Sequence, residues 1–80
     1  MSLVLDASIT LSWYFEDERN EASDAALEQV TFGGAEVPAL WRLEVANGLQ
    51  MALRRQRITA AYRDAALSDL RCFDIRVDPQ

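Results

Sequence analysis

Short apolar runs mark three places in this chain where strands are expected. Residues 3–5 are aliphatic and too few for a helix, so they predict a buried strand. The segment Ala35–Val37 predicts a second short strand, and the alternation of polar and apolar positions across residues 74–78 predicts a third. Each interval between these strands contains two stretches with the spacing of helices. The expected order is therefore strand, helix, helix, strand, helix, helix, strand.

Capping residues and helix breakers bound these helices. Residues 9–15 predict a short first helix, and residues 40–55 predict the third, with Pro38 near its start. The pair Gly33 and Gly34 is expected to end the second helix, because glycine tolerates a positive φ. Polar side chains able to cap a first helical turn precede the first, second and fourth helices, and they are Ser8, Asn20 and Thr59.

Apolar positions at helical spacing predict which helix faces are buried. In the second helix the stripe comprises Ala22, Ala26 and Val30. In the third helix a broad apolar arc comprises Val45, Ala46, Leu49, Ala52 and Leu53, and Glu44 lies at its edge. In the fourth helix the recurring positions are Tyr62, Ala66, Leu70 and Phe73, and Cys72 beside Phe73 is expected in the core.

Helices alternating with strands predict an α/β fold in which helical layers cover a parallel sheet. The 80 residues form one small domain at most, spanning residues 1–80. The chain stops at Gln80, directly after the third predicted strand, so one sheet edge and part of one face are expected to be uncovered. This pattern predicts the first part of a longer domain.

Composition excludes several classes of function. The chain has no histidine, so a Ser-His-Asp or Cys-His mechanism within it is excluded. A net charge of -5 argues against binding nucleic acid by charge alone, although bound cations would invert the field of a carboxylate cluster. Apolar runs are far short of the ~20 residues that span a bilayer, and no signal peptide is expected. The single cysteine, Cys72, fits a reducing cytoplasm.

Two carboxylates are placed where ligands bind α/β folds. Asp6 follows the first strand and precedes a helix, and Glu44 lies inside a largely apolar segment. If the fold brings both to one buried sheet edge, two charges about 4 Å apart repel by roughly 4 kcal/mol at an effective ε of about 20. A shared cation relieves this repulsion, and hard oxygen ligands favour Mg²⁺ or Mn²⁺. Such an ion lowers the pKa of a bound water and stabilises charge on a phosphate.

Two segments of the chain resemble a known family. Residues 4–8 (VLDAS), followed by residues 11–18 (LSWYFEDE), are similar to the opening of a PIN domain. Residues 37–47 (VPALWRLEVAN) are similar to its second conserved block in the VapC-type toxin branch. The resemblance implies a three-layer α/β/α fold with a parallel central sheet, here incomplete at the C-terminus. It also implies that Asp6 and Glu44 are the metal-binding and catalytic acids.

The resemblance further implies a Mg²⁺- or Mn²⁺-dependent endoribonuclease, the toxin of a VapBC-type toxin-antitoxin system. Its expected partners are an RNA substrate, a cognate antitoxin and a second copy of the chain. The family's remaining acids follow the third strand, and Asp74 and Asp78 do not replace them because they lie on or beside that strand. The chain alone is therefore expected to be inactive. One alternative is a non-catalytic PIN module that binds an antitoxin or itself, and another is a small α/β domain whose two acids are structural.

Overall fold

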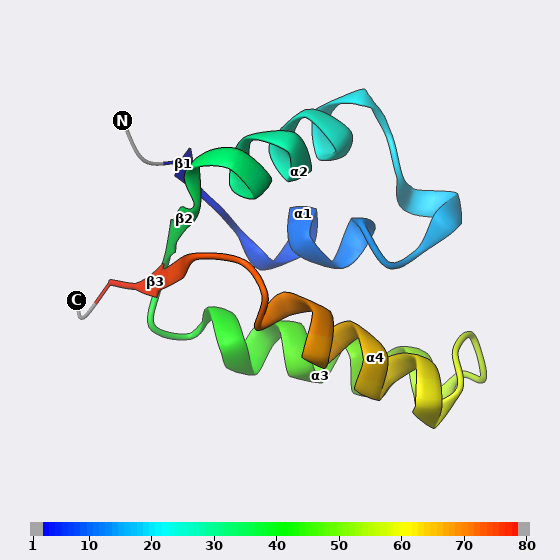
Figure 1. The fold of residues 1–80 in the computed structure, drawn as a ribbon. Coiled ribbons are helices and arrows are strands. Elements are labelled where there is room, and N and C mark those ends of the chain that lie inside the picture. Colours follow the sequence, from blue (N-terminus) through cyan, green and yellow to red (C-terminus); the bar gives the residue numbers. More distant parts are fainter. Residues whose placement is uncertain (1–2, 79–80) are drawn as a thin grey trace.

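A parallel three-stranded sheet and four α-helices make up residues 3–78, which are the residues that the computed structural model describes (Figure 1). The strands are β1 (Leu3–Val4), β2 (Ala35–Val37) and β3 (Ile75–Val77), in the spatial order β1-β2-β3. The helices are α1 (Ala7–Ser12), α2 (Glu21–Gly33), α3 (Trp41–Arg54) and α4 (Ala60–Leu70), with a 3₁₀ turn, η1, at Glu16–Glu18. The predicted element order and the parallel α/β sheet are confirmed.

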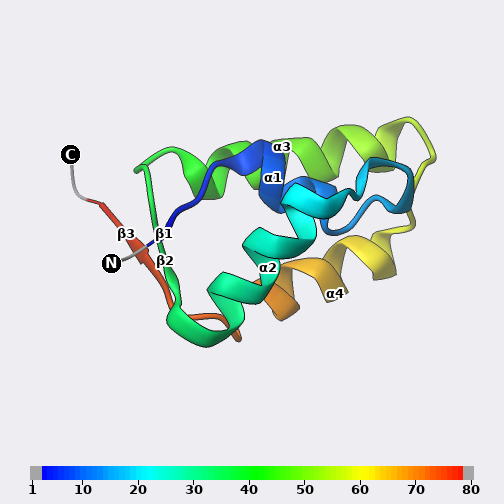
Figure 2. The ribbon, with the colours of Figure 1, turned by 90° about the horizontal axis from the view of Figure 1, so that it is seen from above.

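The helices lie on one side of the sheet (Figures 1 and 2). Both crossovers step in the same direction across the sheet, and right-handed crossovers then place their helices on the same face. The outward row formed by Val4, Glu36 and Arg76, which pair in register, is correspondingly exposed. The opposite face contributes Ala35 and Val37 to the core. One face of the sheet is thus uncovered within residues 3–78.

Local capping chemistry sets most of the helix ends as the sequence predicts. Asn20 and Ser23 form a reciprocal capping box at the start of α2, with both bonds at 2.9 Å. Gly34 ends that helix with a φ of 72°, and Thr59 caps α4 by accepting a hydrogen bond from the Tyr62 backbone N–H at 3.1 Å. These predictions are confirmed.

The predicted cap and extent of the first helix are wrong. Asp6 caps α1, because it leaves β1 in an extended conformation and its Oδ1 accepts from the Ile9 N–H at 2.9 Å. Ser8 lies in the first helical turn and is exposed. The helix ends at Ser12 rather than residue 15, because Phe15 is extended and buried.

Three positions depart from the predicted core. Ala22 is exposed, and the buried residues of α2 are Ser23 and Val30. The Ser23 carbonyl accepts a buried hydrogen bond from Trp13 Nε1 at 2.8 Å, which turns this side of the helix inward. Tyr62, predicted on the apolar stripe of α4, is 44% exposed. Cys72 is also exposed, whereas its neighbour Phe73 packs against Trp13.

The core lies between the covered face of the sheet and the helices. Its fully buried side chains include Leu5, Leu49, Val30, Val37 and Val45. The arc predicted on α3 is largely confirmed, since Val45, Leu49 and Ala52 are buried. Among the helices of residues 3–78, none has the length and apolar character needed to cross a membrane.

Candidate functional site

Asp6 lies between the end of β1 and the start of α1. Its side chain is exposed, and Oδ1 is engaged by the Ile9 N–H as the helix cap. The cap fixes the direction of the carboxylate, because a rotation would leave a first-turn N–H unsatisfied. Asp6 therefore has a structural role in the fold, and its second oxygen, Oδ2, accepts no hydrogen bond from residues 3–78.

Glu44 lies in the first turn of α3, where a negative charge is favourable to the helix dipole. Its side chain is exposed. Within the described part of the chain, its carboxylate makes neither a hydrogen bond nor an ion pair. Apart from this effect on the helix dipole, the Glu44 carboxylate has no partner among the described residues.

Close packing of α1 against α3 brings the first turns of the two helices near each other. Gly48 on α3 lies directly against the Leu11 side chain of α1, and a Cβ at Gly48 would overlap it. One turn back along each helix are Ala7 and Glu44, because residues four apart share a face. Figure 2 shows the two helices running side by side from the same end of the sheet. The end of β1 and the first turn of α3 therefore lie at one end of the molecule.

A chain of two hydrogen bonds, one buried and one partly buried, also joins these two helix starts. Trp41 Nε1 donates to the Thr10 hydroxyl at 3.1 Å, and that hydroxyl donates to the Asp6 carbonyl at 2.9 Å. Trp41 is one turn before Glu44 on α3. Its ring is buried. Trp41 supports the site from within the core.

The prediction that the two acids lie at a buried sheet edge is wrong in one respect. Asp6 and Glu44 are both exposed, so water screens them, and even at the assumed distance of about 4 Å their repulsion would be only about 1 kcal/mol. Within residues 3–78 no group of three or more His, Cys, Asp or Glu side chains could hold a metal ion. Two hard oxygen donors nevertheless suit Mg²⁺, which is commonly held by one or two carboxylates, with water and substrate phosphates as further ligands. Two oxygen donors alone would hold such an ion only weakly.

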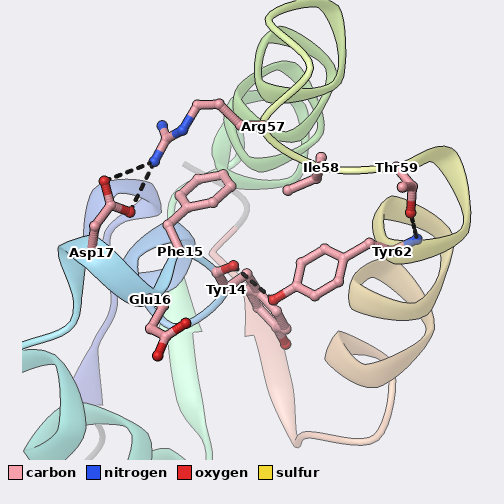
Figure 3. Close-up of a pocket in the computed structure, with 8 residues that line it drawn as sticks. All are labelled: Tyr14, Phe15, Glu16, Asp17, Arg57, Ile58, Thr59 and Tyr62. Carbon is pink, nitrogen blue, oxygen red and sulfur yellow. Dashed lines mark hydrogen bonds and ion pairs between the residues drawn. The ribbon is translucent and has the colours of Figure 1, made fainter.

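A separate pocket, which the sequence did not indicate, lies between the start of η1 and the start of α4. Its volume is about 710 Å³. Its lining comprises Tyr14, Phe15, Glu16, Asp17, Arg57, Ile58, Thr59 and Tyr62 (Figure 3). We call it the Phe15–Tyr62 pocket. No local pattern could reveal it, because it depends on contact between two segments far apart in the sequence.

Polar contacts fix the walls of the Phe15–Tyr62 pocket. The Arg57 guanidinium lies 4.6 Å from the centre of the Phe15 ring, and its Nη2 is 3.1 Å from Asp17 and 3.0 Å from Glu18. The Tyr62 hydroxyl donates to the Tyr14 carbonyl at 2.7 Å. Burial, with the hydrogen bond from Tyr14 to Asp69 as a second cause, raises the pKa of Tyr14 above its ordinary value.

Comparisons with known proteins do not identify a relative. No family model, no curated protein and no solved structure matches the chain. Any assignment of function therefore depends on the residues and geometry described above.

Proposed function

We propose that this chain supplies two acidic residues, Asp6 and Glu44, to the metal site of a PIN-type endoribonuclease. The observation that carries the proposal is the placement of both carboxylates at the starts of two helices that pack together. The hydrogen-bond chain from Trp41 through Thr10 to the Asp6 carbonyl supports it, because it holds those helix starts in register.

The residues of the chain have distinct roles in this proposal. Asp6 presents Oδ2 while Oδ1 caps α1, so the helix positions the ligand. Glu44 supplies a second carboxylate that makes no competing contact within residues 3–78. When bound, Mg²⁺ or Mn²⁺ would lower the pKa of a water molecule and stabilise negative charge on an RNA phosphodiester. Acids beyond this pair belong to other residues of the complete site, so the pair alone is expected to bind metal weakly and to cleave little RNA.

The wider proposal is a cytoplasmic VapC-type toxin with a cognate antitoxin partner and a three-layer fold. The uncovered sheet face supports the third layer, because parallel sheets are usually covered by helices on both faces. Its outward row comprises Val4, Glu36 and Arg76. The exposed side chains of Leu43 and Met51 on α3 support pairing with a second copy of the chain.

A non-catalytic binding module is the second candidate. The capping role of Asp6 favours it, because that role accounts for an aspartate at this position without any metal. In this case partner binding would survive both the loss of the Asp6 carboxylate and the removal of metal.

Mn²⁺ binding to the 80-residue chain, measured by titration calorimetry, separates these candidates. Asp6→Asn is the sharpest variant, because asparagine caps helices as well as aspartate but lacks the negative charge. We expect Asp6→Asn and Glu44→Gln each to weaken Mn²⁺ binding by about tenfold or more. Glu28→Gln removes an exposed acid from the middle of α2 and is expected to leave binding unchanged.

RNA cleavage is the second readout, with Mg²⁺ or Mn²⁺ present and EDTA as the control. Any cleavage should disappear in EDTA and in Asp6→Asn. Equal Mn²⁺ affinity in the wild type, Asp6→Asn and Glu44→Gln would refute the metal site. Metal-dependent cleavage that survives Asp6→Asn would refute the role given to that residue.

A further inference from the structure

We propose that the Phe15–Tyr62 pocket docks a basic side chain, arginine in preference to lysine, from a partner protein. The proposal does not depend on nuclease activity. It is carried by the shape of the pocket, its aromatic walls and the charges at its rim.

One guanidinium of the chain itself, that of Arg57, already lines the pocket. Arg57 lies over the face of Phe15 and pairs with Asp17 (Figure 3). It also pairs with Glu18. A ring face and carboxylate oxygens are the groups that bind a guanidinium, through cation–π attraction and charge-assisted hydrogen bonds. The same kinds of groups remain available on the other side of the pocket.

Glu16 and Tyr62 are those remaining groups. Within residues 3–78 the Glu16 carboxylate makes neither a hydrogen bond nor an ion pair, although it lines the pocket. Tyr62 is 44% exposed, and its hydroxyl donates a hydrogen bond to the Tyr14 carbonyl at 2.7 Å. An anchored ring loses little conformational entropy when a ligand stacks on it, so this wall is organised before binding.

The charges at the rim select the class of partner. Two acids, Glu16 and Asp17, line the pocket with one arginine, Arg57, which also pairs with Glu18, and the chain as a whole carries a net charge of -5. Phosphate groups of RNA would be repelled here, whereas a basic segment of a protein would be attracted. Arginine is favoured over lysine because its planar group both stacks on a ring and pairs with a carboxylate.

Amide NMR of the isotope-labelled 80-residue chain tests the proposal. The probe is the pentapeptide Gly-Arg-Gly-Arg-Gly, with the glutamate analogue Gly-Glu-Gly-Glu-Gly and a short oligoribonucleotide as comparisons. We expect the arginine peptide alone to shift signals, and the shifted signals to cluster at residues 14–18 and 57–62. Shifts spread over the whole surface, or a stronger response to the oligoribonucleotide at these residues, would overturn the assignment.

Matched variants identify the groups that bind. Glu16→Gln and Tyr62→Leu should each weaken arginine-peptide binding by about two- to fivefold, as expected for one exposed ion pair or one cation–π contact. Tyr62→Phe keeps the ring but loses the anchoring hydroxyl, so it should weaken binding less than Tyr62→Leu does. Glu28→Gln removes a charge elsewhere and should bind within about twofold of the wild type. Equal weakening by Glu16→Gln and Glu28→Gln would mean that net charge alone attracts the peptide, and would refute the pocket.

Discussion

Replacing Thr10 by valine tests the hydrogen-bond chain that holds α1 against α3. The Thr10 hydroxyl accepts from Trp41 Nε1 at 3.1 Å and donates to the Asp6 carbonyl at 2.9 Å. Thr10 is 0% exposed and Trp41 is 4% exposed, so water cannot replace the bond between them. Valine keeps the branched shape of threonine without the hydroxyl. The variant therefore leaves the indole N–H of Trp41 buried without an acceptor.

The expected loss follows from counting the groups left unsatisfied. The Asp6 carbonyl still accepts from the backbone N–H of residue 10 at 3.2 Å, so only the indole N–H loses its partner. A buried, unsatisfied donor costs about 1–3 kcal/mol, and we expect a loss near 2 kcal/mol in the free energy of unfolding. For a domain of this size that loss lowers the midpoint of thermal unfolding by about 8–16 °C.

Urea unfolding followed by circular dichroism measures this loss. Thr31→Val is the matched control, because the Thr31 hydroxyl donates to the Leu27 carbonyl at an exposed position, and its removal should change stability by less than about 0.5 kcal/mol. Trp41→Phe and the double variant complete a cycle, with an expected coupling energy of about 1–2 kcal/mol. A Thr10→Val loss no larger than that of Thr31→Val, or full additivity in the cycle, would refute the reasoning.

Two further predictions concern the end of α2 and alkaline pH. Gly34→Ala should lower the free energy of unfolding in urea by about 3 kcal/mol or more, because φ is 72° and a Cβ would lie 2.5 Å from the Asp74 carbonyl oxygen. Gly33→Ala, whose Cβ meets no atom within 4 Å, is the control and should not destabilise. Tyr14 has a pKa raised above 10.0 by burial and by Asp69, so its contribution to stability is complete below pH 10.0 and is lost as the pH rises further. Unfolding free energies measured across this range should fall less steeply for Tyr14→Phe, and equal slopes would contradict the assignment.

Local chemistry explains which parts of the fold the sequence predicts. Asn20, Gly34 and Thr59 act within a few residues of themselves, and each was predicted in its observed role. The predicted cap of the first helix was wrong because Asp6 and Ser8 are both good N-cap residues. The choice between them depends on where β1 ends. That point is set by pairing with β2, which single-residue preferences do not contain.

The candidate site was predictable in part for the same reason. The positions of Asp6 after a strand and Glu44 on a helix follow from local patterns, and the structure places both as expected along the chain. The exposure of both side chains to water could not be predicted from local patterns, because it depends on how the helices pack. The contact of Arg57 with Phe15 was likewise unpredictable, since it joins the turn after α3 to the segment after α1.

The parallel pairing of three very short strands has a consequence for the folding pathway. Each strand pair is separated along the chain by two whole helices, so a strand can find its neighbour only after the intervening helices have compacted. We therefore expect the helical contacts to be present in the transition state and the strand pairs to form after it. Substitutions confined to the strands should then accelerate unfolding while leaving the folding rate nearly unchanged, which makes the sheet the part of the molecule that governs the lifetime of the native state.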